Sequence, residues 1–217
     1  MKEKMVKKFL SSLCSMILLL SFSTPTFASD IENPTNADLQ QRSQSVDAND
    51  PAKLKEALAD GLTIDETHPT ATHTFEDGSY IQLSANIDQL SSKASFATAV
   101  STSWATVSLK AYSAVTGDNL LLWTYTMDQE YRSNGSSITW YNSVPSTGFY
   151  VPSWSLWNLD SEVVGVNQSP DDPRGIRATS SIKTSFGIWE VNPQHLNGKL
   201  ILNISGNGRY SGSAYFT

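Results

Sequence analysis

The sequence predicts an all-β protein: an antiparallel β-sandwich of jelly-roll-like form, or a barrel, preceded by one short N-terminal helix. Three observations predict this fold. From residue 70 onward, apolar and polar residues alternate with a period of two, the pattern of strands that bury one face. Turn-forming residues interrupt the alternation at intervals of about 8–15 residues. With 217 residues, 39% of them hydrophobic, the chain is long enough for one core and short for two ordinary domains.

The first 28 residues have the features of a secretory signal peptide. An apolar stretch over residues 9–22 follows four lysines, Lys2, Lys4, Lys7 and Lys8, and precedes small residues at positions 26 and 28. We therefore expect cleavage after Ala28 and a secreted, extracellular protein. The apolar stretch is shorter than the ~20 residues of a membrane span, so we expect no span after cleavage. An uncleaved N-terminal anchor is the alternative.

Removal of this leader changes the composition of the chain. The mature protein keeps 11 basic and 20 acidic residues, a net charge of −9, and loses Cys14, the only cysteine. We therefore expect no disulfide, no thiolate metal site and no cysteine nucleophile. The acidic balance argues against a nucleic-acid partner, because binding phosphates requires a basic surface. The lysine-rich leader and the lack of cystines suit export from a Gram-positive bacterium.

Residues 29–66 are predicted to form an acidic arm that contains a short helix over residues 50–60. This segment carries −6 of the mature net charge of −9. Asp50 can cap the helix, Pro51 fits its first position and Gly61 ends it. The remaining residues, 67–217, are predicted to be the β-sandwich domain.

The first half of this domain is predicted to contain hairpins and long strands. Residues 70–75 and 80–84 flank a turn at 76–79. Residues 103–115 and 120–132 alternate over longer stretches, and the turn Ser133-Asn134-Gly135-Ser136 leads to a strand over 137–142. The parity of these strands places Trp123 and Trp140 in the core, and it places Trp104 and Tyr112 on a polar face.

The second half repeats the pattern. Residues 154–168 suit one long or two short strands, and a loop with two prolines follows at 169–175. A strand over 176–188, a loop over 192–198 and a closing hairpin of 200–204 with 210–216 complete the chain. Together these segments predict roughly eight to ten strands.

A family resemblance rests on three parts of this pattern. They are the strand containing Leu122 and Trp123, the charged and aromatic strand that runs into Asn134-Gly135, and the Trp-containing segment before a Gly-rich closing hairpin. Over residues 96–217 the chain resembles small secreted β-rich proteins of Gram-positive bacteria. The resemblance implies a β-rich fold and export. No activity is attached to that group, so the resemblance implies no function.

The aromatic residues are the leading candidates for ligand binding. Trp104 and Tyr112 share the polar face of one predicted strand, whereas Trp154 and Trp157 are three residues apart, a spacing that sends them to opposite faces of an extended strand. Flat rings among Ser, Thr and Asn suit sugars, whose apolar faces stack on rings while their hydroxyls form hydrogen bonds. The alternative is that these rings line the second sheet or lie under the N-terminal helix.

Paired carboxylates are the leading candidates for catalysis. Secreted glycosidases need one acid and one nucleophile or base about 5–9 Å apart across a cleft. The alternative is a set of solvated charges on a polar sheet face. The candidates are Glu130, Glu162 and Glu190, with Asp128 and Asp160 beside them.

Other catalytic motifs are absent from the sequence. It contains no Gly-x-Ser-x-Gly and no glycine-rich phosphate loop. The three histidines, His68, His73 and His195, are expected at the surface or in loops. Asp118, Asp171 and Asp172 could offer oxygen ligands to calcium, but they lack the spacing of a known calcium loop. We therefore assign no metal site and no cofactor.

These observations favour a secreted, non-enzymatic β-sandwich protein that binds a glycan or a protein outside the cell or at its surface. The expected partner is a cell-wall component, another polysaccharide or a protein. One alternative is a secreted glycan hydrolase that uses two of the three glutamates. Another is a secreted inhibitor, antimicrobial or matrix protein in which residues 29–66 act as a propeptide or docking segment.

Overall fold

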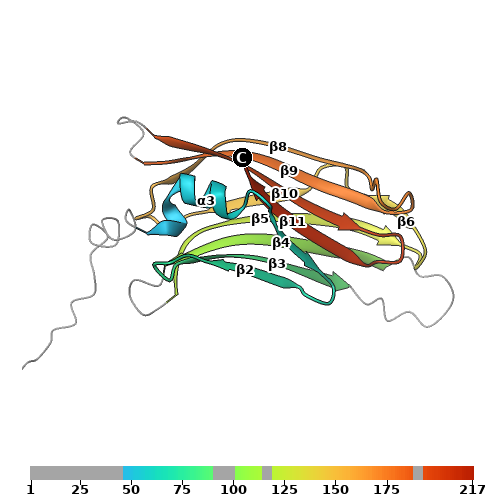
Figure 1. Cartoon of the computed structure of the whole chain (residues 1–217). Helices are drawn as coiled ribbons and strands as arrows, with labels where there is room; N and C mark the ends of the chain where they lie inside the picture. The colour runs from blue at the N-terminus through green and yellow to red at the C-terminus, as the bar shows by residue number, and fades with distance from the viewer. Residues whose placement is uncertain (1–45, 90–100, 114–118, 188–192) are drawn as a thin grey trace, which may run out of the picture. The chain divides into compact units, whose positions relative to one another are not determined.

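Strands with one apolar face bury it by packing against a second sheet, and this chain forms two antiparallel sheets that pack together (Figure 1). The computed structural model describes residues 46–89, 101–113, 119–187 and 193–217. The predicted signal peptide and residues 29–45 of the predicted acidic arm lie outside these residues. The predicted all-β sandwich is confirmed, and its two sheets are not closed into a barrel.

Sheet A has five strands in the order β1-β11-β10-β9-β8. Their bounds are Leu62–Asp65 for β1, Tyr210–Phe216 for β11, Gln194–Ile204 for β10, Ile176–Phe186 for β9 and Trp157–Gln168 for β8.

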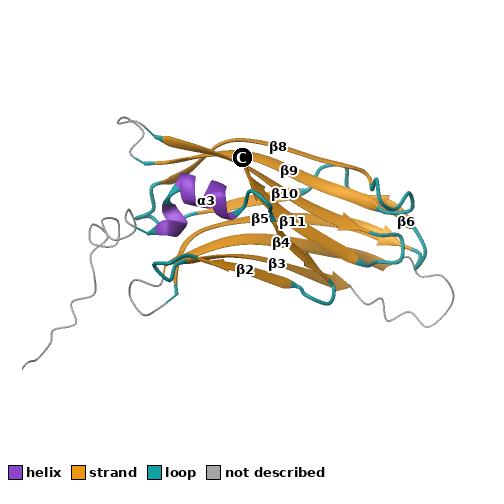
Figure 2. Cartoon of the chain, in the orientation of Figure 1, coloured by secondary structure: helices purple, strands orange, loops and turns teal. Residues whose placement is uncertain are grey.

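Sheet B has six strands, with β7 placed beside β5 next to the path β2-β3-β4-β5-β6. Their bounds are Thr70–Thr74 for β2, Tyr80–Gln89 for β3, Ser101–Ser113 for β4, Leu120–Ser133 for β5, Ile138–Tyr141 for β6 and Ser146–Tyr150 for β7. In each sheet the strands follow chain order except for β1, so the connectivity is that of two meanders rather than the two Greek keys of a jelly roll. Figure 2 shows that most of the described chain is strand.

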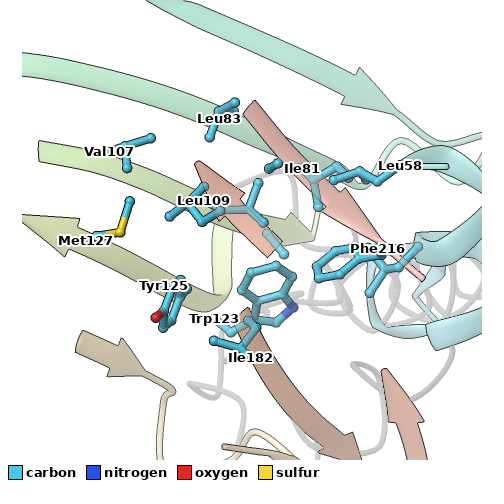
Figure 3. Close-up of a cluster of buried hydrophobic side chains, with 14 of the residues drawn as sticks. Leu58, Ile81, Leu83, Val107, Leu109, Trp123, Tyr125, Met127, Ile182 and Phe216 are labelled. Atoms are coloured by element: carbon cyan, nitrogen blue, oxygen red, sulfur yellow. The ribbon is translucent and has the colours of Figure 1, made fainter. Parts of the chain in front are cut away.

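The inner faces of the two sheets meet in one hydrophobic core (Figure 3). Trp123 on β5 is central: its ring centroid lies 5.8 Å from that of Trp157 on β8 and 6.2 Å from that of Phe216 on β11. Because β5 belongs to sheet B and the other two strands belong to sheet A, these rings join the sheets. The predicted inward position of Trp123 is confirmed.

The segment over residues 46–58 contributes to this core. A 3-10 helix, η1, spans Asp47–Asn49, and the helix expected over residues 50–60 is α3, Pro51–Ala57. The Asp50 side chain caps α3 by accepting a 2.8 Å hydrogen bond from the amide of Ala52. Leu54 and Leu58 have no exposed surface. Because β1 also precedes residue 66, the sandwich begins before the boundary that the sequence suggests.

The prediction that Trp140 lies in the core is wrong. A register shift occurs where β5 pairs with β6: Ser133 lies opposite Ile138, but Arg132 lies opposite Trp140. The bulge turns Trp140 to the side of the sheet on which Arg132 lies, and 42% of its surface is exposed.

The predicted loop over residues 192–198 is also wrong for its described part. β10 begins at Gln194, so His195, Asn197 and Gly198 lie within a strand and pair with β9. Glycine suits position 198 of the strand because the Phe216 ring occupies the space that a Cβ would fill. No helix in the described residues is long and apolar enough to cross a membrane.

Candidate functional site

The outer face of sheet B, defined as the side turned away from sheet A, carries two of the predicted ligand-binding residues. Trp104 and Tyr112 both lie on β4 and are partly exposed. They are eight residues apart, which corresponds to roughly 26 Å along a strand. Thr106, Ser108 and Lys110 lie between them with the same parity, so the two rings stand at the ends of a polar row.

Tyr112 is one half of a stacked pair. Tyr80 on β3 is its cross-strand neighbour, and the two rings lie 4.8 Å apart at an angle of 20°. Partial burial raises the pKa of the Tyr80 hydroxyl, and the adjacent Tyr112 adds to this effect. The stacking holds both rings in place, so this end of the face presents an ordered aromatic surface.

Trp104 lies at the other end, between two carboxylates. Its cross-strand neighbours are Asp88 on β3 and Glu130 on β5. In the next cross-strand pair of this face, the Thr106 hydroxyl donates a 2.5 Å hydrogen bond to Asp128. Acceptor groups therefore surround the indole, as hydroxyl-rich ligands require.

Besides Tyr80, two further aromatic residues of this face were missed from the sequence. Tyr150 on β7 lies opposite Thr124 and is 58% exposed. Trp140 on β6 stacks under the guanidinium of Arg132, which lies 4.9 Å from the ring centroid. Strand parity alone could have identified Tyr80, whereas Trp140 depends on the bulge between β5 and β6.

Trp154 and Trp157 are not available as an exposed platform. Trp154 lies in a turn closed by a 2.9 Å hydrogen bond from the amide of Ser155 to the carbonyl of Pro152, and it is 8% exposed. Trp157 is 3% exposed, packs 5.2 Å from the ring of Phe186 and donates its indole N–H to Asn49. The assumption that both tryptophans lie on one extended strand is wrong, because β8 begins only at Trp157.

The glutamate candidates do not face one another. Glu130 lies on the outer face of β5, whereas Glu162 on β8 accepts a hydrogen bond from the hydroxyl of Tyr125, which points inward from β5. Sheet B therefore separates the two carboxylates. Glu190, the third candidate, lies outside the described residues.

Glu162 instead joins the two sheets. One of its oxygens accepts from Tyr125 and the other accepts a 2.8 Å hydrogen bond from the hydroxyl of Thr147 on β7. The Tyr125 hydroxyl also lies 2.5 Å from that of Ser180 on β9. Burial raises the pKa of Tyr125, and the neighbouring Glu162 raises it further. These bonds occupy both carboxylate oxygens of Glu162, which therefore forms a structural link between the two sheets.

His195 takes part in a polar cluster that sequence reasoning did not anticipate. Its Nδ1 lies 3.1 Å from Asp160 Oδ2, and the hydroxyl of Ser185 donates to Asp160 Oδ1 over 2.7 Å. In a serine hydrolase the hydroxyl would instead face the histidine. Ser185 is only 1% exposed and is bonded to the carboxylate, so the geometry does not provide a nucleophile.

The loop acids considered for calcium are engaged within the protein. Asp171 pairs with Arg177 at 2.8 Å. Asp172 accepts hydrogen bonds from the amides of Gly206 and Arg174, which hold the pKa of its carboxyl below the usual range. Asp118 lies outside the described residues. Within the described ranges, no group of three or more His, Cys, Asp or Glu residues is placed to hold a metal ion.

A hollow of about 590 Å³ lies beside α3. Charged side chains dominate its lining, among them Glu56 and Glu76, both of which are exposed. Lys53 is paired with Asp47 at 2.5 Å, so the one cation in this lining is already neutralised. We therefore interpret this hollow as a solvent-filled surface crevice and not as a ligand site.

Comparison with known proteins identifies no relative of this chain. No protein family, no curated protein and no solved structure matches it. The case for a function therefore rests on the geometry and chemistry of the chain's own residues.

Proposed function

We propose that this is a secreted, non-enzymatic protein that binds an extended polysaccharide along the outer face of sheet B. The leader over residues 1–28 would direct its export. The observation that carries the proposal is the placement of Trp104 and Tyr112 at the two ends of one polar strand face.

The spacing of the rings favours a chain over a single sugar. A ligand that stacks on both Trp104 and Tyr112 must extend over roughly 26 Å. A monosaccharide is far shorter than this span. The ring of Tyr80 lies on β3, next to β4, and the ring of Tyr150 lies on β7, on the far side of β5; both widen the contact area of this face.

The polar groups between the rings favour a glycan over an apolar protein segment. Thr106 and Lys110 on β4 and Thr126 on β5 are partly exposed and offer hydroxyl and ammonium groups to a hydroxyl-rich ligand. A protein partner of typical stability would require a larger apolar centre than these rows provide. The separation of Glu130 and Glu162 by sheet B gives no support for hydrolysis by paired carboxylates.

Retention on insoluble polysaccharides tests the proposal. The protein without its leader, residues 29–217, would be incubated with cellulose, chitin, xylan and purified bacterial cell wall, and the bound fraction measured. We expect Trp104→Ala and Tyr112→Ala each to weaken binding about tenfold, which corresponds to ~1.4 kcal/mol. Both changes lie on a partly exposed face, so we expect the stability of the fold to change little.

Tyr141→Ala is the matched control. Tyr141 is 37% exposed and lies on the same sheet, but its cross-strand neighbour is the inward-facing Tyr131. We expect this variant to bind as the wild type does. Equal retention of the wild type and both platform variants on every polysaccharide would rule out the proposed face, and so would a lack of binding by the wild type.

A further inference from the structure

The outer face of sheet A contains a groove where β1, β11, β10 and β9 run side by side. We call it the β11 groove. Its volume is about 340 Å³, and the residues that matter for its chemistry are Thr63, Arg177, Ile201, Asn203, Ser213 and Tyr215. Ser213 lies opposite Thr63 on one side and Ile201 on the other, so it marks the middle of the groove.

A chain of hydrogen bonds holds the polar side of the β11 groove in place. Arg177 Nε donates to Asn203 Oδ1 over 2.6 Å, and Asn203 Nδ2 donates to the hydroxyl of Ser211 over 3.3 Å. Arg177 also pairs with Asp171 at 2.8 Å. Because Asp171 balances the guanidinium charge, this polar side of the groove offers ordered hydrogen-bonding groups without a free guanidinium.

The aromatic side of the groove is also fixed. The Tyr215 ring lies against Gly61, where a Cβ would be only 2.3 Å from the ring carbon Cε1. Gly61 has a φ of +78°, a conformation that glycine adopts readily. The ring therefore packs on bare backbone and is ordered before any ligand arrives, which lowers the entropic cost of stacking on it.

We propose that the β11 groove binds a short neutral saccharide of one or two rings. Tyr215 and Ile201 offer apolar contact to one face of a sugar ring, while Thr63, Asn203 and Ser213 offer partners for its hydroxyls. The volume lies near the lower end of the range for small-molecule pockets.

Room for a second ring lies next to the groove. A hollow of about 310 Å³ shares Asn203 and Ser211 with it and continues toward Arg209 and Tyr210. The arginine there is 3.2 Å from Glu66, so it is paired, as Arg177 is with Asp171. Because neither guanidinium is left free to bind an anion, the two hollows favour a neutral sugar over a phosphate or a uronic acid.

This site is independent of the polysaccharide face of sheet B. The outer sides of sheets A and B point in opposite directions, since their inner sides share one core. The β11 groove would remain functional if Trp104 and Tyr112 bound nothing. If both sites are occupied, one molecule can hold a polysaccharide on one side and a short saccharide on the other.

A titration followed by NMR tests the proposal. The probes are glucose, galactose, mannose and N-acetylglucosamine, with cellobiose, maltose, lactose and chitobiose as two-ring sugars. We expect at least one of them to cause saturable shifts of the backbone amides of Ser211, Ser213 and Tyr215. Ser213→Leu would fill the middle of the groove and weaken that binding about tenfold or more.

Ser181→Leu is the matched control, since Ser181 lies exposed on β9 of the same sheet and is not part of the groove lining. We expect it to bind the sugar as the wild type does. The proposal is overturned if none of the sugars shifts these amides, or if Ser213→Leu binds with unchanged affinity. Shifts confined to β3, β4 and β5 would overturn the β11 groove while supporting the face of sheet B.

Discussion

The side-chain oxygen of Asn49 accepts a 2.7 Å hydrogen bond from the indole Nε1 of Trp157, which lies 108 residues further along the chain. Both residues are buried, with exposed fractions of 1% and 3%. Asn49 ends the 3-10 helix that precedes α3, and Trp157 begins β8 of sheet A. The bond therefore fastens the N-terminal segment to the sandwich and satisfies an indole N–H in the core.

Asn49→Ala should destabilise the fold through this bond. The variant leaves the indole N–H of Trp157 without its acceptor in a buried position, so we expect the free energy of unfolding to fall by ~1–3 kcal/mol. Urea denaturation followed by tryptophan fluorescence measures the change. Asn167→Ala, which removes an exposed amide on β8, should stay within ~0.5 kcal/mol of the wild type. Equal stabilities of the two variants would show that the bond contributes nothing.

The contact between Asn49 and Trp157 illustrates which parts of the fold the sequence could predict. Local chemistry was sufficient for α3, where Asp50 caps the helix and Pro51 starts it as expected. It was also sufficient to place Trp104 and Tyr112 on a polar strand face. The burial of Trp157 was not predictable in this way, because its covering partner comes from the far end of the sequence.

The period-two alternation of inward and outward side chains also gives the wrong side of the sheet beyond a β-bulge. The parity that correctly buries Trp123 predicts the same for Trp140, but the register shift between β5 and β6 reverses the result. His195 presents the opposite problem. The turn-forming residues around it predict a loop, yet pairing of β10 with β9 and β11 overrides the local preference. Both errors arise from strand pairing, which a single segment does not encode.

Tyr125 should make the stability of the fold fall at alkaline pH. Burial and the nearby Glu162 raise the pKa of its hydroxyl above the ordinary value of about 10. In the unfolded chain the hydroxyl ionises near pH 10, whereas in the folded protein it stays protonated. The folded state therefore holds more protons above pH 10, and its contribution to stability is complete below that pH and is lost as the pH rises.

Tyr125→Phe separates this effect from the general alkaline response. At neutral pH we expect the variant to lose ~1–2 kcal/mol, because Glu162 and Ser180 lose a hydrogen-bond partner. Above about pH 10 we expect its free energy of unfolding to decline less steeply than that of the wild type. Urea titrations across this pH range measure both quantities. Tyr150→Phe, at a residue that is 58% exposed, is the control, and identical slopes in the wild type and Tyr125→Phe would contradict the prediction.

Gly61→Ala should disturb both the fold and the aromatic side of the β11 groove. A side chain at a φ of +78° costs ~1–2 kcal/mol by itself. The added Cβ would also lie 2.3 Å from the Tyr215 ring, so the ring must move. We therefore expect a loss of stability in urea denaturation that exceeds the backbone cost, together with a shift of the Tyr215 ring resonances in the NMR spectrum.

A double-mutant cycle separates the two causes. In the background of Tyr215→Ala the steric conflict is gone and only the backbone cost remains, so Gly61→Ala should destabilise that protein less than it destabilises the wild type. Gly165→Ala on β8 is the control, because nothing lies within 4 Å of its added Cβ, and we expect a change within ~0.5 kcal/mol. If Gly61→Ala costs the same with and without the Tyr215 ring, the ring does not rest on Gly61 in solution. The order that this contact gives to the β11 groove would then be absent.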